Sequence, residues 1–121
     1  MARTIPIDPI LEKGYEVRLL VEDFDGLIAK WSNRSDKFRE TVDSSLDCQY
    51  GNGEKDKLDI FRCGKPNAPL FIFVHGGYWQ RGDKSVYSFV AESFVNSDID
   101  VALIGYQLCP SASMTNIVDK I

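Results

Sequence analysis

Two short apolar runs, separated by a loop and one stretch with a helical pattern, constrain the fold of this chain more than any other feature. The first is Leu70–Val74 and the second is Val101–Ile104. Continuous apolar runs of this length are typical of strands covered on both faces. Between them, Ser85–Asn96 carries apolar side chains at helical spacing, namely Val86, Phe89, Val90, Phe94 and Val95. Strand, helix and strand in this order predict a right-handed crossover between parallel strands, and therefore an α/β fold.

A hairpin pattern precedes the first run. Asp47–Tyr50 and Lys57–Cys63 alternate or run apolar, as half-buried strands do. Gly51-Asn52-Gly53 lies between them and has the composition of a turn whose glycines adopt positive φ. The sequence therefore predicts a β-hairpin before the crossover.

The first third of the chain has a helical pattern. Asp8 before Pro9 predicts a helix start, and Tyr15, Leu19 and Leu20 are expected to form the buried stripe of that helix. A second helix is marked by apolar residues at steps of three and four, namely Phe24, Leu27, Ile28, Trp31, Phe38 and Val42. A last helix begins near Met114, with Ile117, Val118 and Ile121 on the same expected face. We divide the chain into an N-terminal helical segment, 1–46, and an α/β portion, 47–121.

Charge and cysteine content exclude several classes of function. The net charge is −4 and the basic residues do not cluster, so neither nucleic acid nor an anionic membrane is expected as a partner. No apolar run approaches the roughly 18 residues of a membrane span, and the N-terminus lacks the apolar core of a signal peptide. Three widely spaced cysteines, Cys48, Cys63 and Cys109, are typical of free thiols in a reducing compartment. A cytoplasmic location is expected.

The most informative segment is His75-Gly76-Gly77-Tyr78-Trp79, directly after the first apolar run. Ligands in α/β sheets bind beyond the carboxyl ends of parallel strands, where this loop is expected. Paired glycines allow the backbone to approach a ligand and to direct unpaired N–H groups at a developing oxyanion. Such donors are each worth about 3–4 kcal/mol in a transition state. A bare Gly-Gly is more often a simple turn, but this position favours an oxyanion hole.

The segments around this loop resemble a known family. They read YGNGEKDKLDIF, FVHGGYWQRGDKSVYSFVAESF, DVALIGYQLCP and SMTNIVDKI, and they are similar to the serine-dependent arylformamidases, or kynurenine formamidases, of the esterase/lipase branch of the α/β-hydrolase superfamily. The resemblance implies a partial α/β-hydrolase fold. The hairpin would form the first two strands, Leu70–His75 the third, and Asp100–Gly105 the fourth, which lies between the second and third.

The same resemblance implies a reaction and a set of site residues. The reaction is hydrolysis of N-formyl-L-kynurenine to L-kynurenine and formate, in tryptophan degradation, without a cofactor. The oxyanion donors would be the backbone N–H groups of Gly76, Gly77 and Tyr78, and His75 and Trp79 would shape the loop. The substrate would be a small aryl formamide or ester.

The sequence departs from this family in one large respect. It contains no Gly-x-Ser-x-Gly motif, and its only histidine is His75, so the nucleophile, the acid and the catalytic histidine are all missing. The chain is therefore expected to be an N-terminal portion, truncated before the nucleophile elbow and inactive alone. Without a following strand, Leu70–Val74 is expected to be an exposed sheet edge. The isolated chain is therefore expected to be marginally stable, to self-associate through this edge, or to need a chaperone.

Other residues are candidates for chemistry, and each has a simpler interpretation. His75 is expected to bond the backbone through one ring nitrogen rather than act as a general base. Ser85 is expected to lie at a helix start capped by Asp83 rather than act as a nucleophile. Tyr78 and Trp79 line an aromatic pocket or pack in the core, and Cys109 is an ordinary thiol. No His, Cys, Asp and Glu cluster has metal-ligand spacing, so no metal is expected.

Two other functions remain open at this point. One is a carboxylesterase of the same fold, because an oxyanion loop does not itself select the acyl group. The other is a non-catalytic binding or regulatory module, in which the short chain pairs with a full-length paralogue through its third strand.

Overall fold

The computed structural model describes residues 5–121; the first four residues of the predicted segment 1–46 lie outside the described part. One sheet contains four strands in the order β1-β2-β4-β3. The bounds are Asp43–Gln49 for β1, Lys57–Arg62 for β2, Leu70–Val74 for β3 and Asp100–Ile104 for β4. β2 is antiparallel to β1 and to β4, whereas β3 and β4 are parallel. The predicted parallel pair, with the fourth strand between the second and third, is confirmed.

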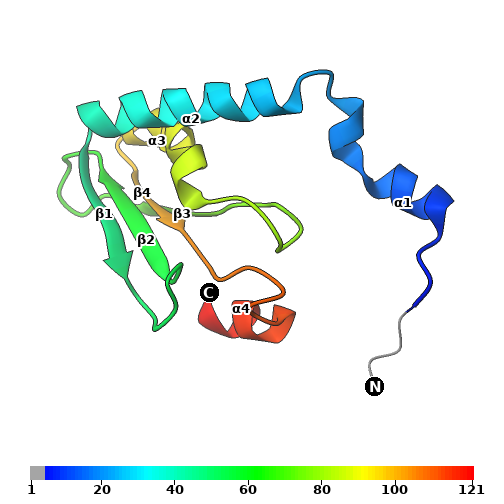
Figure 1. The fold of residues 1–121 in the computed structure, drawn as a ribbon. Coiled ribbons are helices and arrows are strands. Elements are labelled where there is room, and N and C mark those ends of the chain that lie inside the picture. The colour runs from blue at the N-terminus through cyan, green and yellow to red at the C-terminus, as the bar shows by residue number, and fades with distance from the viewer. Residues whose placement is uncertain (1–4) are drawn as a thin grey trace.

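Most of the helical structure lies on one side of this sheet (Figure 1). The α-helices are α1 (Pro9–Tyr15), α2 (Phe24–Thr41), α3 (Ala91–Val95) and α4 (Met114–Lys120), and the 3-10 helices are η1 (Val17–Leu20) and η2 (Lys84–Val90). α2 and α3 run across the same face of the sheet, while α4 lies apart from them near the turn between β1 and β2 (Figure 1). Within residues 5–121, no helix is both long enough and apolar enough to cross a membrane.

The core lies between this sheet face and α2, η2 and α3. Phe61 of β2, Val101 and Leu103 of β4 and Ala91 of α3 are completely buried there, and Phe38 of α2 is 9% exposed. Each large apolar side chain buried in this way contributes about 1.5–3 kcal/mol to folding. Of the predicted apolar stripe of α2, Phe38 packs against Phe61 of β2, whereas Trp31 packs on Tyr87 and Phe89 of η2. The stripe therefore faces η2 along most of its length and meets the sheet near its C-terminal end.

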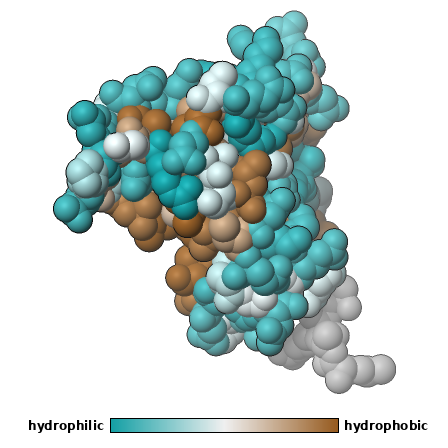
Figure 2. Space-filling model, turned by 90° about the vertical axis from the view of Figure 1, so that its left-hand side faces the viewer, coloured by the Kyte–Doolittle hydropathy of each residue, from teal (hydrophilic) through white to brown (hydrophobic). Residues whose placement is uncertain are grey.

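The prediction that β3 is covered on both faces is wrong. Phe71 and Phe73 pack against the core, but Leu70, Ile72 and Val74 on the opposite face are 57, 57 and 41% exposed. The helices cover only one face of the sheet, and β3 has β4 on one side and no strand on the other within the described chain. Apolar surface is visible among polar surface in the space-filling view (Figure 2). The predicted exposed edge is present in residues 5–121.

The hairpin forms, but its turn differs from the prediction. β1 begins at Asp43, four residues before the expected strand. Gly51 and Gly53 do not adopt positive φ; among the described glycines only Gly64, Gly77 and Gly82 do. A Cβ on Gly51 or Gly53 would overlap the carboxylate of Asp56, which accepts a hydrogen bond from the Gly53 N–H at 2.9 Å. The turn therefore needs glycine because a buried carboxylate lies against it, not because of its φ angles.

The N-terminal segment is helical but does not bury its apolar stripe. α1 begins at Pro9, and the Asp8 carboxylate caps it by accepting from the N–H groups of Ile10 and Leu11. Tyr15, Leu19 and Leu20, predicted to be buried, are 68, 73 and 84% exposed. α1 projects beyond the end of α2 and away from the sheet (Figure 1), so no described surface covers the stripe.

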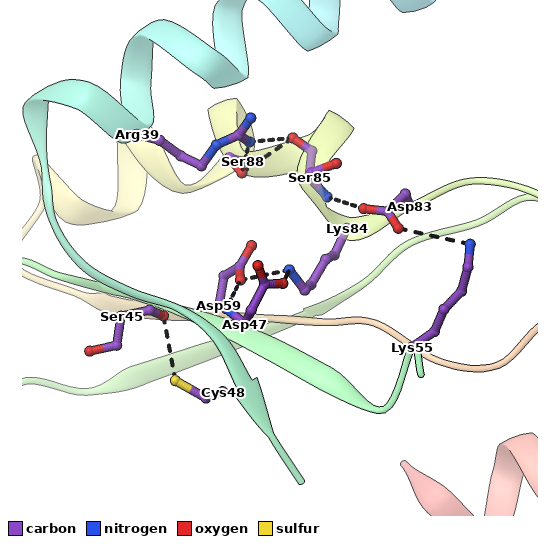
Figure 3. Close-up of polar contacts among 10 residues, drawn as sticks. All are labelled: Arg39, Ser45, Asp47, Cys48, Lys55, Asp59, Asp83, Lys84, Ser85 and Ser88. Carbon is purple, nitrogen blue, oxygen red and sulfur yellow. Dashed lines mark hydrogen bonds and ion pairs between the residues drawn. The ribbon is translucent and has the colours of Figure 1, made fainter. Parts of the chain in front are cut away.

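The predicted helix Ser85–Asn96 is divided into η2 and α3. Asp83 caps its start as expected, by accepting from the Ser85 N–H at 2.9 Å. Side chains of α2 then replace the α-helical hydrogen bonds: Arg39 donates to the Ser85 carbonyl at 2.6 Å, and the Phe89 N–H donates to Ser35 Oγ at 3.0 Å. The carbonyl of Ser85 and the N–H of Phe89, which would bond each other in an α-helix, are thereby occupied, which accounts for the 3-10 conformation. Figure 3 shows the contact of Arg39 with Ser85.

α4 forms where it was predicted, although only one of its apolar residues is buried. Ser113 and Asn116 form a capping box at its start, and Ile117 is 3% exposed. The other members of the expected apolar face are exposed, namely Met114, Val118 and Ile121. Lys120 in its last turn donates to the buried Asp56 carboxylate, which joins α4 to the β1–β2 turn.

Candidate functional site

The loop His75–Trp79 leaves the carboxyl end of β3, beside the end of β4. Gly77 has φ +134°, and Tyr78 and Trp79 have φ +53° and +57°. A Cβ on Gly77 would overlap the carbonyl oxygen of Arg81, and the Gly77 carbonyl accepts from the N–H groups of Gln80 and Arg81, both at 3.1 Å. These contacts require glycine at position 77 and fix the loop in a tight turn.

The backbone N–H groups of Gly76, Gly77 and Tyr78 are not used within the described chain. No hydrogen bond among residues 5–121 has any of these three N–H groups as its donor. Gly76 and Tyr78 are exposed and Gly77 is half-buried, so these consecutive donors are open to water or to a ligand. The three predicted oxyanion donors therefore lie together at the carboxyl end of a parallel strand.

A cavity of about 530 Å³ lies between this loop and the N-terminal segment. Its lining contains four aromatic rings and four charged side chains, namely Tyr15, Phe24, Tyr78 and Tyr87 with Glu12, Glu16, Arg18 and Arg81. The loop contributes Gly76, Gly77 and Tyr78 to the same lining. Tyr78 and Trp79 are 58 and 45% exposed, so neither packs in the core; Tyr78 borders the cavity, as one of the two predicted interpretations requires.

His75 is held by its neighbours at the base of the loop. The ring is 4% exposed and stacks on Tyr106, with centroids 4.5 Å apart, and on Tyr87 at 5.8 Å. Its Nδ1 lies 2.9 Å from the Gly76 carbonyl oxygen, so the neutral ring with a proton on Nδ1 donates to the backbone. The Tyr106 hydroxyl donates to the His75 carbonyl at 2.6 Å. The ring stacking and the two hydrogen bonds therefore fix the orientation of the loop backbone at His75 and Gly76.

The pH dependence of stability is expected to report on His75. Burial lowers the pKa of this histidine, because loss of hydration disfavours the charged ring. The unfolded chain takes up a proton near pH 6.5, while the folded chain resists it, so the free energy of unfolding should fall as the pH drops below about 6.5. Carboxylates titrate below about pH 5 and His75 is the only histidine. Urea unfolding between pH 5 and 8 should show this slope, and a His75→Gln variant should lose it. An equal slope in both proteins would contradict the assignment.

Ser85 and the cysteines do not combine into a catalytic arrangement. No hydrogen bond joins His75 to Ser85 among the described residues, and Ser85 instead meets Arg39 and Asp83 through its backbone. All three cysteines are unpaired. Cys109 closes the loop from the other side, because its N–H donates to the Trp79 carbonyl at 2.7 Å. Residues 5–121 contain no group of three or more His, Cys, Asp or Glu that could hold a metal ion.

An ion cluster that joins η2 to β1 and β2, with Lys84 and Asp59 buried and Asp47 exposed, is a feature that the sequence analysis did not identify (Figure 3). Lys84 is 7% exposed, and its Nζ lies 2.7 Å from Asp59 Oδ1 and 2.8 Å from Asp47 Oδ1. Burial alone would lower the pKa of Lys84, but its hydrogen bonds to Asp47 and Asp59 raise it above the usual value. Asp59 shares a strand face with buried Phe61, so the two-residue period of β2 was the signal for an inward carboxylate that needs a partner.

Comparison with known proteins places the chain among hydrolases, although no family model matches it. Kynurenine formamidase of Danio rerio is 32% identical over 89 residues, which are 72% of this chain and 30% of that protein. Kynurenine formamidase of Drosophila melanogaster is 38% identical over 74 residues, 60% of this chain and 24% of that protein. The chain thus spans less than a third of the length of these relatives.

Solved structures agree on the fold. A putative thioesterase from a Silicibacter species superposes with a TM-score of 0.84 at 30% identity, over 89% of this chain and 42% of that one. An esterase from Pyrobaculum calidifontis superposes with a TM-score of 0.61 at 19% identity, over 96% of this chain and 40% of that one. The chain therefore has part of the α/β-hydrolase fold and belongs to the formamidase and esterase hydrolases, with sequence similarity to part of the kynurenine formamidases.

Proposed function

We propose that these 121 residues form the oxyanion-binding portion of an arylformamidase-like hydrolase, which converts N-formyl-L-kynurenine to L-kynurenine and formate. The observation that carries this proposal is the set of three unused N–H groups at Gly76, Gly77 and Tyr78, on a loop that borders a cavity. The names of the sequence relatives support the formamide as the bond that is hydrolysed. The free thiols of the three cysteines support a cytoplasmic location.

The proposed chemistry divides between this loop and residues outside the chain. A serine oxygen would attack the formyl carbon, and the carbonyl oxygen would become an oxyanion that accepts hydrogen bonds from Gly76 and Gly77. Collapse breaks the C–N bond, the arylamine leaves with a proton from a histidine, and water then releases formate from the serine. The sequence contains no Gly-x-Ser-x-Gly, and its only histidine is bonded to the loop backbone. We therefore expect this chain alone to be inactive.

Two alternatives have observations in their favour. A carboxylesterase is favoured by the names of the solved structures, which include esterases and a putative thioesterase. A non-catalytic binding or regulatory module is favoured by the exposed β3 edge, which offers unpaired backbone groups to another chain.

An assay with two substrates separates these functions. The native protein carrying this sequence is purified from its own cells and given N-formyl-L-kynurenine and 4-nitrophenyl acetate. We expect a higher kcat/KM for N-formyl-L-kynurenine. A preference for the aryl ester would support the carboxylesterase, and turnover of neither substrate would support the binding module and overturn the proposal.

We further propose that the chain self-associates through β3. Its edge is free within residues 5–121, and Leu70, Ile72 and Val74 add an apolar face beside that edge. An Ile72→Lys substitution places a charge there and is expected to shift the sedimentation coefficient toward that of a monomer. Leu20→Lys is the control, because Leu20 is also apolar and exposed but lies outside the sheet. A wild-type chain that sediments as a single monomeric species and melts cooperatively would contradict this proposal.

A further inference from the structure

Arg81, unlike Arg18, is a cation of the cavity lining that has no partner among residues 5–121. Its guanidinium makes no hydrogen bond or ion pair within residues 5–121, whereas Arg18 is bonded to Glu16 at 2.6 Å. Its backbone is fixed to the oxyanion loop, because the Arg81 N–H donates to the Gly77 carbonyl and the Arg81 carbonyl lies against the Gly77 Cα. The same tight turn therefore holds the unpaired guanidinium of Arg81 and the three unused N–H groups close together in the chain.

The charges of the cavity form a balanced set. Hydrogen bonding to Arg18 lowers the pKa of the Glu16 carboxyl, and the charge of Arg81 also acts in that direction, so Arg81 lies within electrostatic range of Glu16. Once Glu16 and Arg18 neutralise each other, one cation and one carboxylate remain in the lining, Arg81 and Glu12. A ligand with one carboxylate and one ammonium group would complement this remainder.

The rest of the lining is aromatic. Tyr15 and Phe24 come from the N-terminal segment, and Tyr78 and Tyr87 come from the loop side. Rings on both walls are suited to stacking with an aromatic ligand. The volume of about 530 Å³ falls within the range of small-molecule sites.

We infer that Arg81 is the residue that binds the carboxylate of the aromatic amino acid substrate in this cavity, with Glu12 as the partner of its ammonium group. The inference rests on the proposed function, which supplies the oxyanion-binding loop at the same cavity. A guanidinium can donate two parallel hydrogen bonds to a carboxylate, which fixes orientation as well as charge. The carboxylate contact would orient the distant formyl group toward Gly76 and Gly77.

Binding measurements on the full chain test this without catalysis. The probes are L-kynurenine, which has the amino acid group, and 2-aminoacetophenone, which keeps the aryl ketone but lacks that group. By titration calorimetry, Arg81→Gln should weaken L-kynurenine binding about tenfold or more and leave 2-aminoacetophenone unchanged. Arg81→Lys should recover part of the loss, because it keeps the charge but not the paired donors. Lys37→Gln, which removes an exposed and unpaired cation on α2, should change neither affinity.

The possible failures are distinguishable. If Arg81→Gln weakens the binding of both probes equally while its melting curve stays cooperative, Arg81 only maintains the shape of the cavity. It then does not bind the carboxylate, and the inference is overturned. If it changes neither, or if the wild-type chain binds both probes equally well, the inference is overturned and the oxyanion loop is unaffected. If the wild-type chain binds neither probe, the cavity is not a substrate site, and the proposed function loses its support as well.

Discussion

The Gly77→Ala substitution is expected to lower the turnover of the hydrolase that carries this chain by a factor of about 10² to 10³, the cost of losing one oxyanion donor. Gly77 has φ +134°, a conformation that alanine rarely adopts, and an added Cβ would overlap the Arg81 carbonyl oxygen. The loop would have to change its path, which moves the N–H groups of Gly77 and Tyr78. The measurement is kcat for hydrolysis of N-formyl-L-kynurenine, with circular dichroism to verify folding.

Gly76→Ala is the matched control for this prediction. A Cβ on Gly76 meets no atom within 4 Å, Gly76 is not among the residues with positive φ, and alanine keeps the backbone N–H. We expect turnover within a few-fold of wild type. A folded Gly77→Ala protein with unchanged kcat would show that the loop does not hold the transition state.

The second large effect is a loss of stability when the buried ion pair between Lys84 and Asp59 is broken. Lys84→Met should lower the free energy of unfolding by about 3–5 kcal/mol, because it leaves the Asp59 carboxylate buried and without its cation. Asp59 is 1% exposed, and its Oδ1 accepts both from Lys84 Nζ and from the Asp47 N–H (Figure 3). Urea denaturation followed by circular dichroism measures the loss.

Two further variants separate a buried charge from a simple lost contact. Lys55→Met removes an exposed ion pair with Asp83 at 3.9 Å and should cost less than about 1 kcal/mol. Lys84→Met combined with Asp59→Leu removes both buried charges and should recover part of the stability lost by Lys84→Met. A cost below about 1 kcal/mol for Lys84→Met would contradict the burial of an ion pair at this position.

The elements that carry the loop were predictable because their signals are local. The apolar runs of β3 and β4, with a loop and a helical pattern between them, specify a crossover, and the structure has the two strands parallel and adjacent. Asp8 and Asp83 were recognised as caps because a capping side chain bonds N–H groups only two or three residues away. The position of Gly76 and Gly77 at a strand end follows from the same local order.

Features that depend on distant neighbours were not predictable in this way. The periodicity of Tyr15, Leu19 and Leu20 shows which side is apolar but not whether another element covers it, and none does in residues 5–121. The exposed face of β3 depends on helices packing on only one side of the sheet. The 3-10 conformation of η2 depends on Ser35 and Arg39, about fifty residues earlier in the chain.

Only one side of the candidate site could be predicted from the sequence, for the same reason. The loop was identified from its glycines, but the second wall of the cavity comes from Glu12, Glu16 and Arg18, far from the loop in sequence. No local sequence pattern predicts that Arg18 and Arg81 line the same cavity. The ion pair between Lys84 and Asp59 likewise joins residues 25 positions apart. Its only local signal was that Asp59 lies on the face of β2 that points to the core.

Top-down mass spectrometry of the native protein, purified from its own cells after incubation with a fluorophosphonate probe, tests most directly whether this loop serves a serine nucleophile. We expect one probe adduct on a species heavier than the 13.7 kDa of this chain, at a serine outside residues 1–121. An adduct on Ser85 or another residue of the chain would place the nucleophile here and contradict the proposed division. If no species reacts with the probe, the protein has no activated serine nucleophile, and the proposed function itself is contradicted.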